Sequence, residues 1–264
     1  MKKYKGFIIF IIILAIYFLI MYFVFGNQEN NPNPTNNQNN NQSNSVKENK
    51  YIVIGNESNY NYSNGSFTNV KIKEIESVDK FKVYVNNKYY GDYKLKNAGN
   101  WNLFDKNNEY VHYNGNMLAF SDDFNIEVRN NYKIREINEK DKVFLINDYH
   151  ISSFSNLTVN QAIDIDLDNN GVLDEIILVS SLDDTVSVKN YFSIVVIKLN
   201  NEKITLIEER EDNAKNVYSL FAIINIENNK NDSIIISKTE GYISEKPKVS
   251  SLIYKYKNDQ YVID

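Results

Sequence analysis

The chain contains no cysteine among its 264 residues. A disulfide framework, a thiolate nucleophile, a cysteine-ligated zinc and a lipid-modified N-terminal cysteine are therefore all excluded. Glycine (9) and proline (3) are too sparse for a collagen-like or glycine-rich chain. The two histidines, His112 and His150, lie in no H-E-x-x-H motif and near no G-x-S-x-G turn. No local motif therefore identifies the chain as an enzyme of a familiar class.

Positive charge is also scarce. Lys and Arg together number 29 against 34 Asp and Glu, which gives a formal net charge of -5. Removing the three positive charges of Lys2, Lys3 and Lys5 from this value leaves -8 for the remainder. A protein that binds nucleic acid needs a clustered basic surface to release counterions from phosphates. We therefore expect no nucleic-acid partner.

Residues 7–25 form an uncharged apolar run, FIIFIIILAIYFLIMYFVF. At a rise of about 1.5 Å per residue, a helix of this length nearly crosses a hydrocarbon layer of about 30 Å. We expect a transmembrane helix whose lipid-facing surface contacts the bilayer. The lysines of residues 1–6 precede the run and no basic residue follows it before Lys47, so the positive-inside rule places residues 1–6 in the cytoplasm. The remainder is then extracellular, on the outer face of a bacterial cell membrane.

The alternative is a secreted protein whose signal peptide is cleaved after Gly26, which places Gly26 at the −1 position and Val24 at the −3 position of the cleavage site. The run is longer than a usual signal-peptide core, and no A-x-A site follows it, which favours the anchor. Residues 27–50 are Asn-rich and polar and lack apolar periodicity. Such a segment cannot bury enough apolar surface to offset its ordering entropy, so we expect a disordered linker.

The residues after the linker are rich in aromatic side chains, with 20 Tyr and 14 Phe in the whole chain. Their apolar residues recur mostly with period two, in short runs bounded by Asn, Asp and Gly. Residues 80–96 illustrate the pattern of a hairpin, because alternating apolar residues lead to a turn at Asn86-Asn87 and a second run returns. Similar strands are expected at 124–128, 132–137 and 143–149, and no stretch keeps a helical period for three turns. The pattern predicts an all-β fold of antiparallel sheets.

A composition break at residues 150–156 divides this region into two β-rich subdomains, 51–150 and 151–264. The second contains an internal repeat at an offset of about 57 to 58 residues. In each copy a polar loop precedes a strand, at 175–178 and at 233–236, and a hairpin follows, at 197–204 and at 254–261. Two such blade-like units cannot close a propeller, which takes four or more. We expect two small antiparallel sheets packed together or on the first subdomain.

The first of these polar loops carries the strongest chemical signal, within AIDIDLDNNGVLDEIIL at residues 162–178. In an extended strand, Asp164, Asp166 and Asp168 share one face while the apolar residues between them face a core. Neighbouring carboxylates at this spacing of about 7 Å repel by about 2 kcal/mol at an effective dielectric near 20. A bound cation would relieve that repulsion.

From Asp166 the spacing D-x-D-x-N-G-x-x-D places oxygen-bearing side chains at relative positions 1, 3, 5 and 9, with Gly171 at position 6. Oxygen ligands suit Ca²⁺, and glycine permits the sharp bend that wraps the ion. An EF-hand also needs an acid at position 12, where Ile177 stands, and strands rather than helices flank this loop. The loop is therefore not an EF-hand.

Residues 161–179 resemble instead the calcium loop of FG-GAP or VCBS-type repeats, in which D-x-D-x-[DN]-G-x-x-D joins two strands. The resemblance implies Ca²⁺ held by the side chains of Asp166, Asp168, Asn170 and Asp174 and by the backbone carbonyl of Val172. A degenerate copy at 225–236 offers Asn225, Glu227 and Asp232 without the glycine, and we expect no metal there. The alternative for the first loop is an Asp/Asn-rich turn without a metal.

These features favour a noncatalytic extracellular module that binds or scaffolds, with a structural calcium site. The alternative is a cell-envelope hydrolase whose Asp/Glu active site is not marked by a local motif. Trp101, the only tryptophan, is either a core residue or a sugar-stacking platform, and we expect it in the core.

Overall fold

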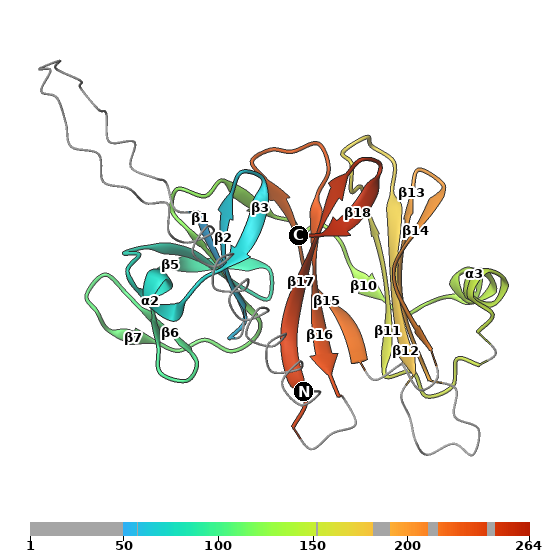
Figure 1. The fold of residues 1–264 in the computed structure, drawn as a ribbon, viewed down its shortest axis with the longest axis horizontal. Helices are drawn as coiled ribbons and strands as arrows, with labels where there is room; N and C mark the ends of the chain where they lie inside the picture. The colour runs from blue at the N-terminus through green and yellow to red at the C-terminus, as the bar shows by residue number, and fades with distance from the viewer. Residues whose placement is uncertain (1–49, 57, 152, 182–190, 211–215, 242–245) are drawn as a thin grey trace, which may run out of the picture. The chain divides into compact units, whose positions relative to one another are not determined.

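The computed structural model describes residues 50–264 except 57, 152, 182–190, 211–215 and 242–245 (Figure 1). The predicted cytoplasmic tail (1–6), transmembrane helix (7–25) and linker (27–50, save its last residue) lie outside the described residues. Among the residues that are described, no helix is both long enough and apolar enough to cross a membrane. Residues 47–264 form one compact unit.

The described part is predominantly antiparallel β-structure, in three sheets. Sheet 1 has the order β3-β2-β1-β8-β4-β5-β6-β7, sheet 2 the order β10-β11-β12-β13-β14 and sheet 3 the order β18-β17-β16-β15-β9. The strands of sheet 1 are β1 (Lys50–Ile54), β2 (Ser58–Ser63), β3 (Ser66–Asn69), β4 (Phe81–Val85), β5 (Lys88–Asn97), β6 (Trp101–Phe104), β7 (Tyr110–Val111) and β8 (Met117–Ser121). Those of sheet 2 are β10 (Ile134–Arg135), β11 (Val159–Ile165), β12 (Asp174–Ser181), β13 (Phe192–Leu199) and β14 (Glu202–Arg210). Those of sheet 3 are β9 (Ile126–Val128), β15 (Asn216–Ile226), β16 (Ser233–Glu240), β17 (Lys248–Lys257) and β18 (Gln260–Ile263).

Tight turns built from Asn and Asp join several of the hairpins. Asn86 and Asn87 between β4 and β5 have φ of 50° and 61°, and Asn200 and Asn201 between β13 and β14 have 50° and 67°. Two successive positive φ values match the right-handed twist of the flanking strands, and asparagine tolerates them better than most residues. The hairpins predicted at 80–96, 197–204 and 254–261 are all present.

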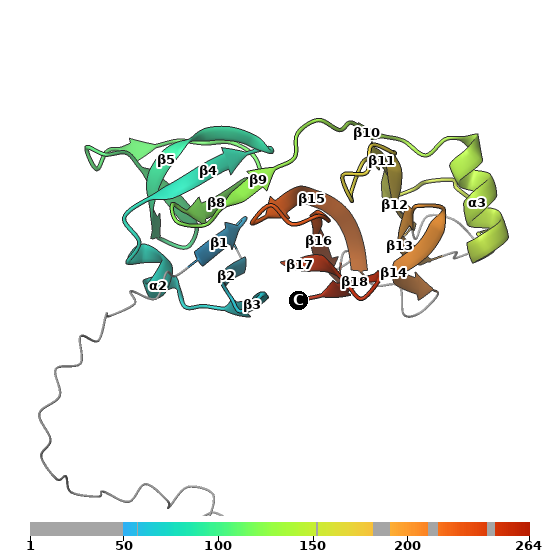
Figure 2. The ribbon, with the colours of Figure 1, turned by 90° about the horizontal axis from the view of Figure 1, so that it is seen from above.

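Alternation of side chains along the strands lets sheet 3 share a core with each of the other two sheets. In β15, Ile223 packs in a core with sheet 2, whereas Ala222 and Ile224 pack in a core with β1 and β8 of sheet 1. Figure 2 shows β15–β17 between the strands of sheets 1 and 2. Trp101 is only 1% exposed, in the core on the other side of sheet 1, so it is the core residue that we predicted.

The strand predicted at 143–149 is wrong, because these residues belong to helix α3 (Glu139–Tyr149). Asn138 caps the helix: its side chain accepts hydrogen bonds from the backbone N–H groups of Lys140 and Asp141. The short apolar run Val143–Ile146 suggested a strand, but the buried side chains Asp141, Leu145 and Tyr149 recur at every fourth position, which is the period of a helix face. A second helix, α2 (Ile72–Glu76), is a single short turn.

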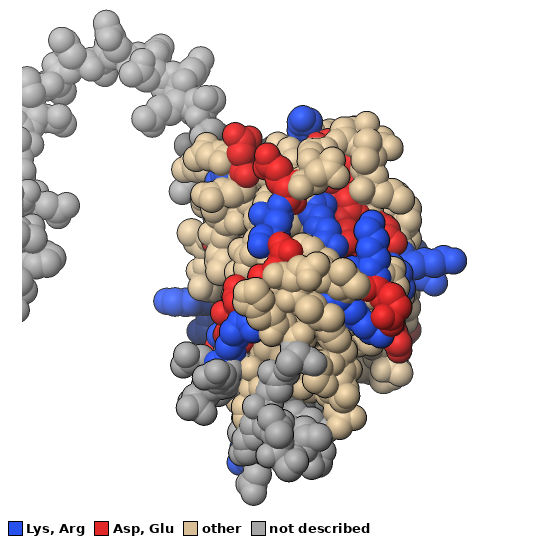
Figure 3. All heavy atoms as spheres, turned by 90° about the vertical axis from the view of Figure 1, so that its right-hand side faces the viewer, with Lys and Arg blue, Asp and Glu red and all other residues tan. Residues whose placement is uncertain are grey.

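The strands predicted at 124–128 and 132–137 are present but shorter, as β9 and β10. Both precede residue 150, yet β9 pairs with β15 and β10 pairs with β11. Each therefore extends an antiparallel four-stranded unit, β15–β18 or β11–β14, that corresponds to one copy of the repeat. Helix α3 covers the outer face of sheet 2, where Lys and Arg side chains are interspersed with Asp and Glu (Figure 3).

Candidate metal centre

The acidic loop of residues 166–173 joins two neighbouring antiparallel strands, β11 and β12. Ile165, the last residue of β11, pairs with Asp174, the first residue of β12. Ile163, Ile165 and Leu167 are buried in the core between sheets 2 and 3, as the alternating pattern predicted. Because β11 ends at Ile165, the residues after it are free to curl instead of continuing along the strand face.

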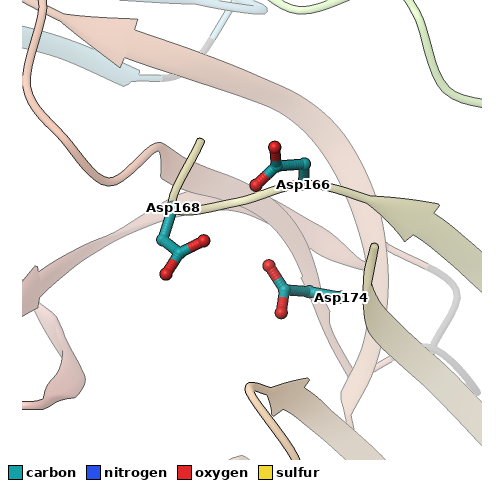
Figure 4. Close-up of side chains that lie close together, drawn as sticks. All are labelled: Asp166, Asp168 and Asp174. Atoms are coloured by element: carbon teal, nitrogen blue, oxygen red, sulfur yellow. The ribbon is translucent and has the colours of Figure 1, made fainter. Parts of the chain in front are cut away.

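Asp166, Asp168 and Asp174 converge as a result of this curl. One oxygen from each carboxylate lies within 4.8 Å of the others (Figure 4). Asp168 and Asp174 are only 5% and 3% exposed, and Asp166 is half-buried. Asp164, which we expected on the same face, lies apart from this cluster and forms an ion pair with Arg135 at 3.2 Å.

Backbone N–H groups of the loop orient the Asp166 carboxylate. Asn170 N–H donates to Oδ1 at 3.0 Å, and Gly171 N–H donates to Oδ2 at 2.8 Å. Gly171 has φ of +86°, a conformation that strains any residue with a Cβ. The glycine of the motif therefore permits the backbone bend that directs the N–H groups of Asn170 and Gly171 toward the Asp166 carboxylate.

Asn200, in the turn between β13 and β14, holds the other two carboxylates. Its side-chain amide donates to Asp168 Oδ2 at 3.0 Å, and its backbone N–H donates to Asp174 Oδ1 at 3.2 Å. The second oxygen of Asp174 accepts from the backbone N–H of Leu167 at 2.9 Å. Our sequence interpretation missed Asn200. Glu175 of β12 pairs with Lys198 of β13, which places the β13–β14 turn beside the acidic loop. Predicting this strand register from the sequence would have identified Asn200 as a neighbour of the aspartates.

Among the described residues, no basic side chain is paired with the cluster to offset its negative charge. All of these donors are neutral, and within the described ranges no Lys or Arg forms an ion pair with Asp166, Asp168 or Asp174. Burial raises the pKa of Asp174, and the charges of Asp168 and Asp166 raise it further, against the opposing effect of hydrogen bonds from Leu167 and Asn200. At an effective dielectric near 20, two charges this close repel by on the order of 3 kcal/mol. The three aspartates form a buried acidic cluster that could hold a metal ion.

The other two predicted ligands are placed in the same loop. The Asn170 side-chain oxygen accepts a hydrogen bond from Val172 N–H at 2.7 Å, and its amide donates to Asn200 Oδ1 at 2.7 Å. The Val172 side chain is exposed to solvent. That Asn170 and the Val172 carbonyl contact an ion remains a prediction.

Comparison with known proteins gives no relative. No family model, no curated protein and no solved structure matches this chain. The candidate site is therefore judged on its own geometry.

In the degenerate loop between β15 and β16, the aspartate forms an ion pair with Arg129, which follows β9. Arg129 Nη1 lies 3.1 Å from an oxygen of Asp232, whose side chain is fully buried. Asn225 also donates to Asp232, at 2.8 Å. Glu227 turns away from this pair and forms an ion pair with Lys50. The charge of this buried aspartate is thus paired with an internal guanidinium.

The two loops contact each other directly. Asp232 N–H donates to the Leu167 carbonyl at 2.8 Å, and the Asn169 side chain donates to the Lys230 carbonyl at 2.8 Å. Arg129 also donates to Asn169 Oδ1 at 2.9 Å, which links the two loops through one guanidinium. The candidate centre therefore lies where the two four-stranded units meet.

Proposed function

We propose that this chain is a noncatalytic binding or scaffolding module, anchored on the outer face of a bacterial cell membrane, whose two repeated sheets are held together by a structural calcium ion. The observation that carries the proposal is the buried cluster of Asp166, Asp168 and Asp174, which forms no ion pair with a basic side chain among the described residues. Three ionised carboxylates in one buried cluster are costly unless a cation joins them.

Calcium is the ion that suits this donor set best. The cluster offers only carboxylate oxygens, which are hard ligands, and no histidine or cysteine. The resemblance of residues 161–179 to FG-GAP and VCBS-type loops adds the Asn170 side chain and the Val172 carbonyl to the proposed shell, with water completing it. Ca²⁺ tolerates such a shell because it accepts six to eight oxygen ligands in flexible geometry.

A structural role follows from the position of the cluster. The loop is hydrogen-bonded to the β13–β14 turn through Asn200 and to the degenerate loop of the other unit through Leu167 and Asn169. An ion bound there fixes the contact between the two units. Neither Asp174 nor Asp232, the carboxyls whose pKa burial raises, lines the pockets on sheet 1 or beside α3. This is why we favour the module over the alternative of a motif-less hydrolase.

The membrane part of the proposal rests on the sequence of residues 1–25. With the N-terminal lysines in the cytoplasm, residues 51–264 lie outside, separated from the bilayer by the Asn-rich linker. Protease added to intact cells should then digest the C-terminal part. Reporter fusions at the C-terminus that are active only in the cytoplasm would contradict this topology.

Thermal unfolding of the full chain tests the calcium site. An ion that binds only the native state must raise the unfolding midpoint, so we expect a higher midpoint in millimolar Ca²⁺ than in a chelator. The Asp174→Asn variant should lose most of this increase, whereas the exposed control Asp123→Asn should keep it. If Ca²⁺ does not change the unfolding midpoint of the unaltered chain, the proposed calcium site is refuted.

A further inference from the structure

A polar pocket with a volume of about 370 Å³ lies on the opposite side of sheet 3 from the acidic loop. One wall comes from β15, β16 and β17 and the other from the ends of β1 and β8 in sheet 1. Pockets that bind small molecules typically start at about 300 Å³, so the space is sufficient for one small ligand.

Three serines form a row across one wall of this pocket. Ser219 of β15 pairs with Ser237 of β16, and Ser237 pairs with Ser251 of β17. Neighbouring strands are about 4.8 Å apart, so the row spans about 10 Å with all three side chains on the same face. Each serine is half-buried, and within the described part of the chain none of the three hydroxyls makes a hydrogen bond. The three adjacent hydroxyls can therefore donate hydrogen bonds to a ligand in the pocket and accept them from it.

A β-bulge places an aromatic ring beside this row. The register between β15 and β16 shifts between Leu220 and Ala222, so Phe221 is the extra residue of the bulged strand. Its ring lines the pocket and is only half-buried. Bulges of this kind are common next to binding sites, where they redirect a side chain.

The facing wall from sheet 1 is also polar and neutral. The side-chain oxygen of Asn56 accepts a hydrogen bond from the backbone N–H of Trp101 at 3.1 Å, which leaves the Asn56 amide N–H groups as donors. The Tyr113 hydroxyl donates to the Trp101 carbonyl at 3.1 Å and keeps its capacity to accept. Asn116 adds a further amide. Among the residues that the structure describes, no Asp, Glu, Lys, Arg or His lines the pocket.

These surroundings restrict the ligand class. A charged ligand would be desolvated without a counter-charge, and an apolar ligand would leave the three serine hydroxyls without partners. A neutral sugar has hydroxyls that both donate and accept, and a C–H face that can pack on Phe221 and on Val249, which is 39% exposed at the rim. We infer that this pocket binds a neutral carbohydrate of about one sugar ring. This rests on the proposed function as a binding module and names its ligand class.

Ligand-observed NMR on the full chain, in a detergent without a sugar headgroup, tests the inference with D-glucose and N-acetyl-D-glucosamine as probes. We expect saturation transfer to at least one of them. Ser237→Ala removes the central hydroxyl and should weaken binding roughly three- to tenfold, the effect of losing one hydrogen bond. Ser237→Leu fills the wall and should abolish binding. The control Ser250→Ala, one residue from Ser251 on the opposite face of β17, should bind as the unaltered chain does.

Two further probes, sodium gluconate and cyclohexanol, test charge and polarity. Absence of transfer to both sugars, tighter binding of gluconate or cyclohexanol, or unchanged sugar binding in Ser237→Leu would each overturn the inference. The unfolding midpoint with and without Ca²⁺ is measured on the same samples. If Ca²⁺ raises the unfolding midpoint but neither sugar binds, only the proposal for the pocket is refuted. If a sugar binds but Ca²⁺ leaves the midpoint unchanged, only the proposal for the metal site is refuted.

Discussion

Asp174 and Asp232 occupy corresponding places at the start of the second strand in each four-stranded unit, and both are buried. Burial raises the pKa of each, but only Asp232 has a basic neighbour, Arg129, whose charge opposes the rise. An arginine side chain in a protein stays protonated, so Arg129 provides a permanent positive charge beside the second loop. In the first loop, the proposed Ca²⁺ would serve the same purpose. Under this proposal the degenerate loop, which already has an internal cation beside Asp232, needs neither the glycine nor the full set of acids of the motif.

The raised pKa of Asp174 predicts how calcium binding depends on pH. Its folded, metal-free pKa lies above the unfolded value of 3.8, so in the absence of metal its ionisation costs stability as pH rises from 3.8 through the folded pKa. Ca²⁺ binds the ionised form and competes with the proton. The increase in unfolding midpoint caused by Ca²⁺ should be complete at neutral pH and fall as the pH drops through the raised pKa, earlier than for an ordinary carboxyl.

Midpoints measured with Ca²⁺ and with a chelator across a pH series check this dependence. The Asp123→Asn control should show the same curve as the unaltered chain. A calcium effect that is constant from neutral pH down to the ordinary pKa of aspartate would contradict the prediction.

Helix α3 is attached to sheet 2 through a partly buried charge network, whose centre is Arg135. Its guanidinium lies 2.6 Å from Asp141 at the start of α3, and it also contacts Asp164 and Glu175 on the sheet. Burial acts to raise the pKa of Asp141, but the hydrogen bonds from Arg135 and from Asn138 N–H outweigh it, so the pKa is lowered. Asp141 is completely buried and therefore depends on this arginine.

Replacing Arg135 with methionine should destabilise the protein by about 3 to 5 kcal/mol, because it leaves a buried carboxylate unpaired. Urea unfolding at neutral pH measures the change. Lys142→Met, which removes only an exposed ion pair with Glu139 on the same helix, should cost less than about 1 kcal/mol. The double variant Arg135→Met with Asp141→Leu should recover part of the loss, and equal costs for Arg135→Met and Lys142→Met would contradict this account.

Elements set by local chemistry were predictable, whereas those set by pairing between strands were not. The Asn86-Asn87 turn is visible in the sequence because the two residues and the flanking alternation lie side by side. The spacing from Asp166 to Asp174 is likewise local, and the three carboxylates do converge. Asn200 and Arg129 reach the loops only through strand pairing, and the row of Ser219, Ser237 and Ser251 exists only because three strands align. Helix α3 was missed because its apolar run is too short to distinguish the helical period of 3.6 residues from the strand period of two.

At the scale of the whole unit, the candidate metal site and the proposed sugar pocket lie against opposite faces of sheet 3. The acidic loop contacts this sheet at the β15–β16 turn, and the pocket uses the serine row of β15–β17. Sheet 3 also shares a core with sheet 1 through Ile224 and Ile235. An ion that fixes the contact between sheets 2 and 3, as we propose, would therefore also stabilise the sheet that forms one wall of the pocket.

Hydrogen exchange with and without Ca²⁺ should show that the ion stabilises both loops and not the first alone. Asp232 N–H donates to the Leu167 carbonyl, so opening of the first loop must also release an amide of the second unit. Ca²⁺ should slow exchange of the loop amides of Asn170 and Gly171 and also of Asp232, because local opening then requires loss of the ion. The amides of β6 and β7, at the edge of sheet 1, should change least. In Asp174→Asn the effect of Ca²⁺ should vanish at all these positions, and protection confined to residues 166–174 in the unaltered chain would show that the ion does not link the two units.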